Sequence, residues 1–464
     1  MSHFVRATGA LAAIFIFATF SIAAGEANKS QLPNILFILA DDLGWHDLGC
    51  YGHEIHETPN IDKLAGDGMR FTDGYAAAPV CGPTRASILS GKYPSRTGYT
   101  HNWLTPNPEE QPFWGEGMPR TWHAFMKLEE LTLAEALRDS GYQTAFVGKW
   151  HLGEAPFYPR RQGFDVNVGG SHWGHPYEGY FSPYKMPNLK NGPEGEYLTD
   201  RLTGEAINVL EGFSSSRKPW LLFMSYYTVH GPIQGKPEKV AKYKEKRRHM
   251  RADGLNAEYA AMVESLDQNV GRLIKWLDDK ELRENTVVIF TSDNGGWVQA
   301  TTNKPLRSYK GHLLEGGIRV PWIVSWPGVT KPGSICRKPV ISTDFYPTIL
   351  ETLGLKLRPE QHRDGVSLAP ILRGDSDFDR GPMVWHYPHV RISKPGSAIR
   401  SGDWKLIHYY QDGRRELYNL NDDIGESHDL AGRLPEKAAA MKARLDAMLR
   451  DQGAKIPSRD LYSR

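Results

Sequence analysis

Continuous apolar runs of strand length, separated by helical patterns, constrain the fold of this chain most strongly. The runs are apolar at nearly every position rather than at alternate positions, which is typical of strands buried on both faces of a sheet. They are Asn34–Ala40, Thr144–Val147, Trp220–Tyr226, Val287–Thr291 and Pro321–Trp326. Apolar residues at helical spacing lie between or beside them, at Leu131–Ser140, Tyr197–Phe213, Ala257–Lys280 and Asp344–Leu353. This alternation predicts an α/β fold with a large mixed, mainly parallel sheet sandwiched by helices.

The character of the sequence changes after residue 380. The apolar segments become short and are separated by Gly, Asp and Pro: Met383–Tyr387, Ser397–Ile399, Trp404–Tyr410 and Glu416–Tyr418. These predict antiparallel strands, closed by a helix over Leu434–Leu449. We therefore expect an N-terminal catalytic domain at 28–380 and a smaller C-terminal α+β subdomain with an antiparallel sheet at 381–464.

Residues 1–27 differ from the rest of the chain. Arg6 precedes the apolar run Leu11–Ala24, and small residues follow that fit a cleavage site. The run is shorter than the roughly 20 apolar residues that a membrane span needs, and no later run is long enough. The pattern predicts a signal peptide at 1–27 and export to the periplasm or the extracellular space, without a stable membrane span. A single N-terminal membrane anchor is the alternative.

Charge and cysteine content exclude two classes of protein. Lys and Arg number 56 and Asp and Glu 54, and the one basic run, Lys242–His249, contains a Glu and is interpreted as a solvated surface. This balance argues against a nucleic-acid partner. Cys50, Cys81 and Cys336 are too few for a disulfide framework, although export would permit a bridge between Cys50 and Cys336.

Polar and charged residues follow the predicted strands where each strand ends. They are Asp41-Asp42, Gly148-Lys149-Trp150-His151, His230-Gly231-Pro232 and Ser292-Asp293-Asn294-Gly295. In open α/β sheets the functional residues gather at the carboxyl ends of strands, so we expect these groups to converge. Asp41, Asp42, Asp293 and Asn294 offer only oxygen ligands, which suit Ca²⁺ or Mg²⁺ rather than zinc.

A cysteine stands at the start of a predicted helix. Pro83 and Gly91 frame this helix, which places Cys81 at its N-terminus. Free backbone amides and the helix dipole favour an anion there, and Arg85 lies one turn further on to bind the same anion.

These motifs resemble the type I, formylglycine-dependent sulfatases of the alkaline phosphatase superfamily, with the character of secreted bacterial carbohydrate sulfatases. The family signature Cys-x-Pro-Ser/Thr-Arg matches residues 81–85, and the similarity spans nearly the whole chain after residue 27. It continues through Lys310-Gly311, the stretch 315–321, Gly402–Ile407 and Glu416–Leu420. The resemblance implies the alkaline-phosphatase-like fold and the hydrolysis of sulfuric esters.

The resemblance also implies a role for each site residue. Cys81 would be oxidised to 3-oxoalanine (formylglycine) by a formylglycine-generating enzyme or an anaerobic sulfatase-maturating enzyme, and its hydrated gem-diol would attack sulfur. One divalent cation, Ca²⁺ with Mg²⁺ as the alternative, would be held by Asp41, Asp42, Asp293, Asn294 and the modified residue 81. The other implied catalytic residues are Arg85 for orientation, Lys149 and Lys310 for the sulfate oxygens, His151 as base for the second step, and His230, together with Lys310, as acid for the leaving oxygen.

Two loops suggest the substrate. Residues 100–127 and 171–187 are rich in aromatic side chains, which suit sugar faces but also serve loop packing. The predicted substrate-binding residues are His172, Trp173, Tyr177, His386 and His389. A sulfated poly- or oligosaccharide is the predicted substrate. The alternatives are a broad arylsulfatase, a phosphatase or phosphonate monoester hydrolase of the same superfamily, and an inactive sugar-binding protein.

Overall fold

The computed structural model describes residues 1, 32–101, 125–216, 218–250, 255–390 and 392–456. Its main sheet has eight strands in the order β5-β4-β6-β1-β7-β8-β2-β9. The four at its centre are β4 (Gln143–Gly148), β6 (Trp220–Ser225), β1 (Asn34–Ala40) and β7 (Thr286–Ser292). They run parallel, and β8 (Trp322–Ser325) pairs antiparallel with β7. The outer strands are β2 (Met69–Phe71), β5 (Val166–Val168) and β9 (Ser334–Cys336). The predicted mixed, mainly parallel sheet is confirmed.

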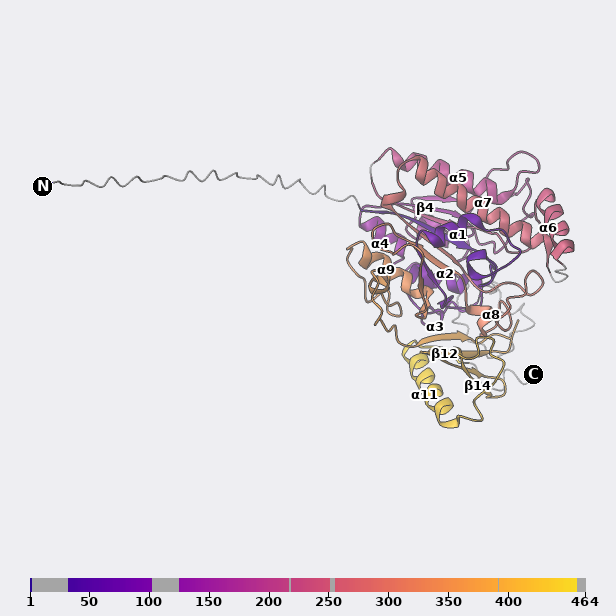
Figure 1. Ribbon diagram of the computed structural model, residues 1–464, viewed down its shortest axis with the longest axis vertical. Helices are drawn as coiled ribbons and strands as arrows, with labels where there is room; N and C mark the ends of the chain where they lie inside the picture. Colours follow the sequence, from indigo (N-terminus) through magenta and orange to yellow (C-terminus); the bar gives the residue numbers. More distant parts are fainter. Residues whose placement is uncertain (2–31, 102–124, 217, 251–254, 391, 457–464) are drawn as a thin grey trace. The chain divides into compact units, whose positions relative to one another are not determined.

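Helices cover both faces of this sheet (Figure 1). On one face, Leu36 and Ile38 of β1 join the core formed with α1 (Pro59–Gly66), α5 (Leu198–Ser214) and α7 (Ala257–Asp279). On the other face, the Phe37 ring packs edge-on against Phe345 of α9 at 4.9 Å. Successive strand residues point to opposite faces, so a strand covered on both sides is apolar throughout. The second layer contains α2 (Cys81–Ser90), α4 (Leu133–Asp139) and α9 (Phe345–Thr352).

The C-terminal part carries its own four-stranded sheet, in the order β11-β12-β13-β14. Its strands, Met383–Tyr387, Gly396–Ser401, Trp404–Tyr409 and Arg415–Asn419, pair antiparallel in chain order. Helix α11 (Pro435–Asp451) buries Leu445 and Leu449 in the core of this sheet. The predicted antiparallel sheet and closing helix are therefore confirmed, whereas the boundary at residue 380 stays a prediction.

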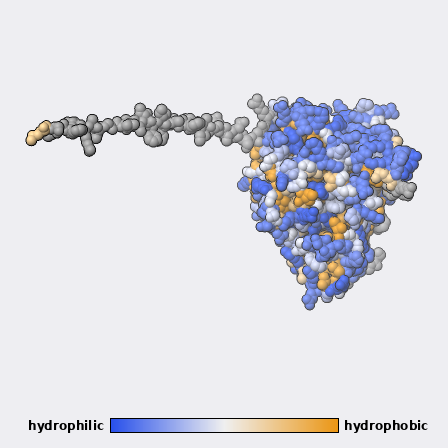
Figure 2. Space-filling model, viewed as in Figure 1, coloured by the Kyte–Doolittle hydropathy of each residue, from blue (hydrophilic) through white to orange (hydrophobic). Residues whose placement is uncertain are grey.

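The remaining elements are short or lie at the surface: β3 (Gly74–Tyr75), β10 (Val340–Ile341), α3 (Pro94–Thr97), α6 (Pro237–Met250), α8 (Glu315–Ile318) and α10 (Ala369–Leu372). The basic run Lys242–His249 forms part of α6. No helix within the described ranges is long and apolar enough to cross a membrane. Figure 2 shows a mainly hydrophilic face with small, separate apolar patches. Cys50, Cys81 and Cys336 are all free thiols. The predicted signal peptide at 1–27 lies outside the described residues, apart from Met1.

Candidate active site

The carboxylates that follow β1 and β7 meet at one end of the sheet. The two strands are parallel neighbours, with Ala40 paired to Ser292, so the residues that follow them are brought side by side. The Asp42 backbone N–H donates to Asp293 Oδ1 at 3.2 Å, and Asn294 Nδ2 donates to Asp42 Oδ1 at 2.7 Å. Asp41, Asp42, Asp293 and Asn294 are all buried.

Each of the three carboxylates is paired with a buried cation. Lys149 Nζ lies 2.6 Å from Asp41 Oδ2, Lys310 Nζ lies 2.6 Å from Asp42 Oδ1, and Arg85 Nη2 lies 2.7 Å from Asp293 Oδ2. Burial raises the pKa of Asp41 to about 8 and outweighs the opposing charge of Lys149. Burial also acts on Asp42, but there the Lys310 ammonium prevails and the pKa lies below its usual range.

Several polar atoms in this cluster fit a divalent cation. Asp41 Oδ1 and Asn294 Oδ1 are buried and have no hydrogen-bond partner within the described part of the chain. One ligand atom each from Asp41, Asp42, Cys81 and His230 lie within 4.8 Å of one another. Buried oxygens without a donor are costly unless something else satisfies them, and a hard cation does so. The convergence of His230 with these residues was predicted, but in the role of an acid and not as a potential metal ligand.

Cys81 opens helix α2 directly beside these carboxylates. The preceding Val80 is extended, and Thr84 fixes the turn because its Oγ1 donates to the Ala78 carbonyl at 3.0 Å. Cys81 is 1% exposed, and burial raises the pKa of its thiol to about 12. A thiol with so high a pKa carries almost no thiolate at neutral pH and is a poor nucleophile in this form.

Arg85 joins the ends of three parallel strands. Its Nε donates to Asp293 Oδ2 at 2.8 Å, and its Nη1 donates to the Lys149 carbonyl at 2.8 Å and to Ser225 Oγ at 2.5 Å. These partners follow β7 and β4 and end β6. Ser225 was not among the predicted site residues, although its position at a strand end was a usable signal.

His151 is held in a left-handed backbone conformation, with φ of 57°. Its N–H donates to the Ser171 carbonyl at 3.0 Å, and its own carbonyl accepts the Tyr99 hydroxyl at 2.9 Å. Gly174 lies against the ring, since a Cβ there would stand 2.4 Å from His151 Cε1. Burial, reinforced by Lys149, lowers the pKa of His151 well below its usual value, so the imidazole is neutral. Tyr99 and Gly174 carry no motif that could have identified them.

His230 lies near Oδ2 of Asp42, whereas Lys310 is paired with Oδ1 of the same carboxylate. Its Nδ1 donates to the Gly231 carbonyl at 2.8 Å, and its Nε2 lies 3.7 Å from Asp42 Oδ2. Burial and the Lys310 ammonium lower the pKa of His230 to about 3. The ring is therefore neutral in the substrate-free protein.

The loop at 171–187 divides into a buried part and an exposed part. Tyr180 and Tyr184 are buried in the core, and the Tyr180 hydroxyl donates to the Tyr227 carbonyl at 2.6 Å. His172 and Tyr177 are exposed, and the half-buried Trp173 ring lies 4.6 Å from that of Tyr177. Gly174, which follows Trp173 in the chain, lies close to the His151 ring. The other predicted aromatic loop falls mostly on residues 102–124, outside the described residues.

Two predicted substrate residues are buried in the structure. His386 Nδ1 lies 2.8 Å from Ser397 Oγ, and its Nε2 lies 3.1 Å from the Lys455 carbonyl, so both ring nitrogens are occupied inside the C-terminal part. His386 is therefore not free to bind a substrate in the way that the sequence had predicted. His389 is fully buried, with its Nε2 2.9 Å from Thr100 Oγ1.

Comparisons with known proteins agree over most of the chain. The model of the sulfatase family matches residues 33–355. The model described as N-sulphoglucosamine sulphohydrolase, C-terminal, matches residues 309–455. The first match includes every residue of the cluster described above.

Individual relatives are similar over most of their length. A sulfatase of Formosa agariphila is 34% identical over 497 aligned residues, covering 90% of this chain and 88% of that protein. The N-acetylgalactosamine-6-sulfatase of Canis lupus familiaris is 33% identical, covering 85% and 76%. The crystal structure of Ps i-CgsB in complex with k-i-k-neocarrahexaose has a TM-score of 0.77 at 30% identity, covering 92% and 95%.

Proposed function

The chain belongs to the sulfatase family and is a sulfatase enzyme, and from this premise we propose that it removes sulfate from a sulfated poly- or oligosaccharide. The observation that carries the proposal is the convergence of Cys81 with paired carboxylates and lysines at the carboxyl end of the sheet. Trp173 and Tyr177 pack against each other near Gly174, the residue that faces His151, and would supply flat surfaces suited to a sugar ring. The hexaose bound by Ps i-CgsB and the amino sugar in the name of the canine relative support a carbohydrate substrate.

We propose that Cys81 acts as formylglycine. The raised pKa of the unmodified thiol argues against a thiolate nucleophile, whereas the hydrated aldehyde supplies two hydroxyl groups, one to attack sulfur and one for the second step. The oxidation would be carried out by a formylglycine-generating enzyme or an anaerobic sulfatase-maturating enzyme.

Asp41, Asp42, Asp293 and Asn294 would hold one Ca²⁺, with Mg²⁺ as the alternative. When bound, the cation would supply positive charge that lowers the pKa of the attacking hydroxyl and stabilises charge on the sulfate oxygens. Arg85 would orient the modified residue, since its guanidinium is fixed by Asp293 and Ser225. This oxygen-rich set argues against a phosphatase with several histidine ligands.

The two lysines would bind the sulfate group, and the two histidines would transfer protons. Lys149 and Lys310 would bind sulfate oxygens as a fixed positive field. His151, neutral and enclosed, suits a general base. His230 would protonate the leaving oxygen; a bound sulfate anion would favour its protonated form, and the Lys310 ammonium is a second donor.

Export is part of the same proposal, since the apolar run Leu11–Ala24 has the features of a signal peptide. N-terminal sequencing of protein recovered outside the cytoplasm should show removal of residues up to about position 27, because small residues mark the cleavage site there.

The substrate class is tested by desulfation of defined sulfated oligosaccharides, each paired with the corresponding phosphate ester and with nitrophenyl sulfate. We expect sulfate release from at least one oligosaccharide with a higher kcat/KM than from nitrophenyl sulfate. Turnover of nitrophenyl sulfate alone would favour the arylsulfatase alternative. Faster phosphate than sulfate release would contradict the proposal.

A further inference from the structure

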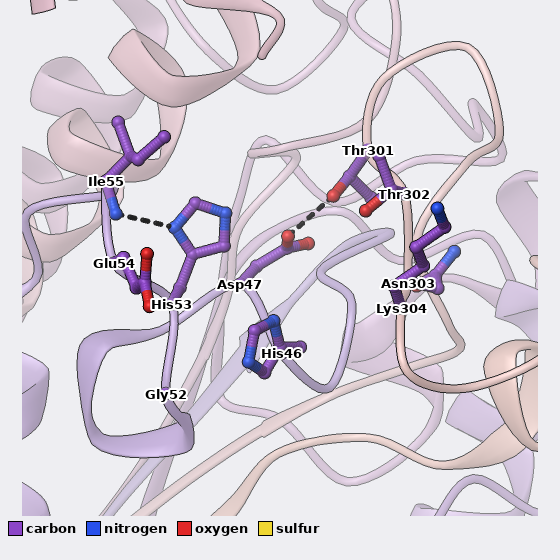
Figure 3. A pocket seen from close by; sticks show the side chains of 10 residues that line it. All are labelled: His46, Asp47, Gly52, His53, Glu54, Ile55, Thr301, Thr302, Asn303 and Lys304. Atoms are coloured by element: carbon purple, nitrogen blue, oxygen red, sulfur yellow. Dashed lines mark hydrogen bonds between the residues drawn. The ribbon is translucent and has the colours of Figure 1, made fainter. Parts of the chain in front are cut away.

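A second group of potential metal ligands lies outside the catalytic cluster, in the loop that follows β1. It combines Asp47, His53 and His56, whose ligand atoms lie within 4.8 Å of one another. The group borders a pocket of about 340 Å³ that His46, Asp47 and His53 share with residues 301–304 (Figure 3). We propose that Asp47, His53 and His56 bind one transition-metal cation of the Zn²⁺ class.

His56 is already oriented as a ligand. Its Nδ1 lies 2.9 Å from the Asp47 carbonyl and must donate to it, so the lone pair of the neutral ring is on Nε2. No hydrogen bond to Nε2 is found in the described part of the chain, although the side chain is only 6% exposed. A second hydrogen bond that fixes the tautomer and leaves the other nitrogen free is the usual arrangement of a metal-binding histidine.

Three hydrogen bonds fix the Asp47 carboxylate, but one acceptor position remains for a cation. Its Oδ2 accepts the Gly44 N–H at 2.8 Å and the Tyr259 hydroxyl at 2.6 Å. Its Oδ1 accepts the Thr301 hydroxyl at 2.7 Å. A carboxylate oxygen accepts two bonds, so Oδ1 retains one position for a cation.

His53 is the adjustable member of the group. Its ring stacks on that of His56 at 3.6 Å, and its Nδ1 accepts the backbone N–H groups of Ile55 at 3.2 Å and His56 at 2.9 Å. Two stacked imidazoles cannot both direct their in-plane lone pairs at one cation, so the His53 ring would have to turn out of this stack and bring Nδ1 toward Asp47. Coordination would therefore replace two hydrogen bonds, and we expect micromolar rather than nanomolar affinity.

The ligand types separate this site from the catalytic cluster. Two imidazoles and one carboxylate favour Zn²⁺, Ni²⁺ or Cu²⁺, whereas the oxygen-rich set beside Cys81 favours Ca²⁺. Tyr259 touches both regions, since its hydroxyl also lies 3.4 Å from the Asp42 carbonyl. A cation bound by Asp47, His53 and His56 would therefore restrict the motion of the loop that follows β1.

The test is calorimetric titration of Zn²⁺ into the full chain loaded with Ca²⁺. We expect one equivalent to bind to the wild type and at least tenfold weaker binding to His56→Gln and to His53→Ala. Replacing the buried His56 could disturb folding, whereas His53 is only half-buried, so its variant tests the site independently. The matched control is His428→Gln, at an exposed histidine beside Asp423. Cu²⁺ electron paramagnetic resonance should show two nitrogen ligands, and one in His53→Ala.

Equal Zn²⁺ binding by wild type and His56→Gln would overturn the proposal. So would loss of the Zn²⁺ equivalent in Cys81→Ser with retention in His56→Gln, because that result would place the ion in the catalytic cluster. The proposal does not depend on the sulfatase mechanism.

Discussion

At the scale of single residues, Gly174 is a testable positioning element for His151, the proposed general base. A Cβ at this position would lie 2.4–2.9 Å from three ring atoms of His151, closer than real contacts allow. Gly174→Ala should therefore displace the imidazole and lower kcat by about 10²-fold, the effect of a misplacement near 1 Å. Steady-state kinetics with nitrophenyl sulfate would measure it.

Gly212→Ala is the matched control, because nothing lies within 4 Å of its added Cβ in helix α5. It should leave kcat unchanged and stabilise the helix by about 0.5–1 kcal/mol. An unchanged kcat in Gly174→Ala as well would show that the loop does not position His151.

Replacing His151 and replacing His230 should change the kinetics in different ways. Loss of a general acid lowers the rate by about 10²–10⁴-fold, and the effect is largest for a substrate with a poor leaving group. His230→Ala should therefore damage sugar desulfation far more than hydrolysis of nitrophenyl sulfate. His151→Ala should release a burst of nitrophenol and then turn over slowly, as seen by rapid-quench kinetics. Equal losses on both substrates for both variants, without a burst, would refute this division of roles.

Residue types and strand ends predicted most of the catalytic cluster, but not the contacts that hold it. Asp41 and Asp293 could be predicted because parallel strands bring their following residues to one edge. Tyr99 and Gly174 could not, because each acts on His151 through a loop whose path depends on tertiary packing. The burial of His386 was missed for the same reason.

At the scale of elements, the ends of β1 and β7 should be linked by the cation. Buried carboxylates from both strands face one another there, so an ion bound only by the folded state stabilises it by mass action, about 2.7 kcal/mol at 100 times Kd. Calorimetry should show that Ca²⁺ raises Tm above the value in EGTA, and that Asp41→Ala abolishes this response. Asp279→Ala, at an exposed carboxylate paired with Lys275, is the control and should respond like the wild type. An equal Ca²⁺ response in Asp41→Ala would contradict the ligand assignment.

Elements were predicted best where burial is uniform. The bounds of β1 and β11 coincide with the predicted segments, and those of α7 differ by one residue. The short strands β2, β5 and β9 were not predicted, because segments of three residues carry too little periodicity.

At the scale of the whole molecule, one buried lysine links the C-terminal sheet to helix α8. Lys405 of β13 lies 2.8 Å from Glu315 of α8 and 2.8 Å from Glu426, and all three side chains are fully buried. Lys405→Met would leave the buried Glu426 carboxylate without this cation and would leave Glu315 paired only with Arg319 among the described residues. We expect it to lower the free energy of unfolding by about 3–5 kcal/mol, the cost of breaking a buried ion pair.

The control for this prediction is Lys442→Met, which removes a partly exposed pair with Asp446 within helix α11. Such pairs contribute about 0.3–0.5 kcal/mol, so its denaturant midpoint should barely move. Similar midpoints for the two variants would mean that the buried triad does not hold the C-terminal sheet in place.

The measurement that tests the central claim most directly is the mass of the peptide containing Cys81, taken from enzyme with measured sulfatase activity. Conversion of the thiol to the aldehyde removes about 18 Da, a change distinct from the oxygen additions of ordinary cysteine oxidation. We predict that the fraction of peptide with this loss equals the fraction of active sites across preparations, and that Cys81→Ser is inactive in a host that does not oxidise serine. Full activity in a preparation whose Cys81 is entirely unmodified would contradict the account.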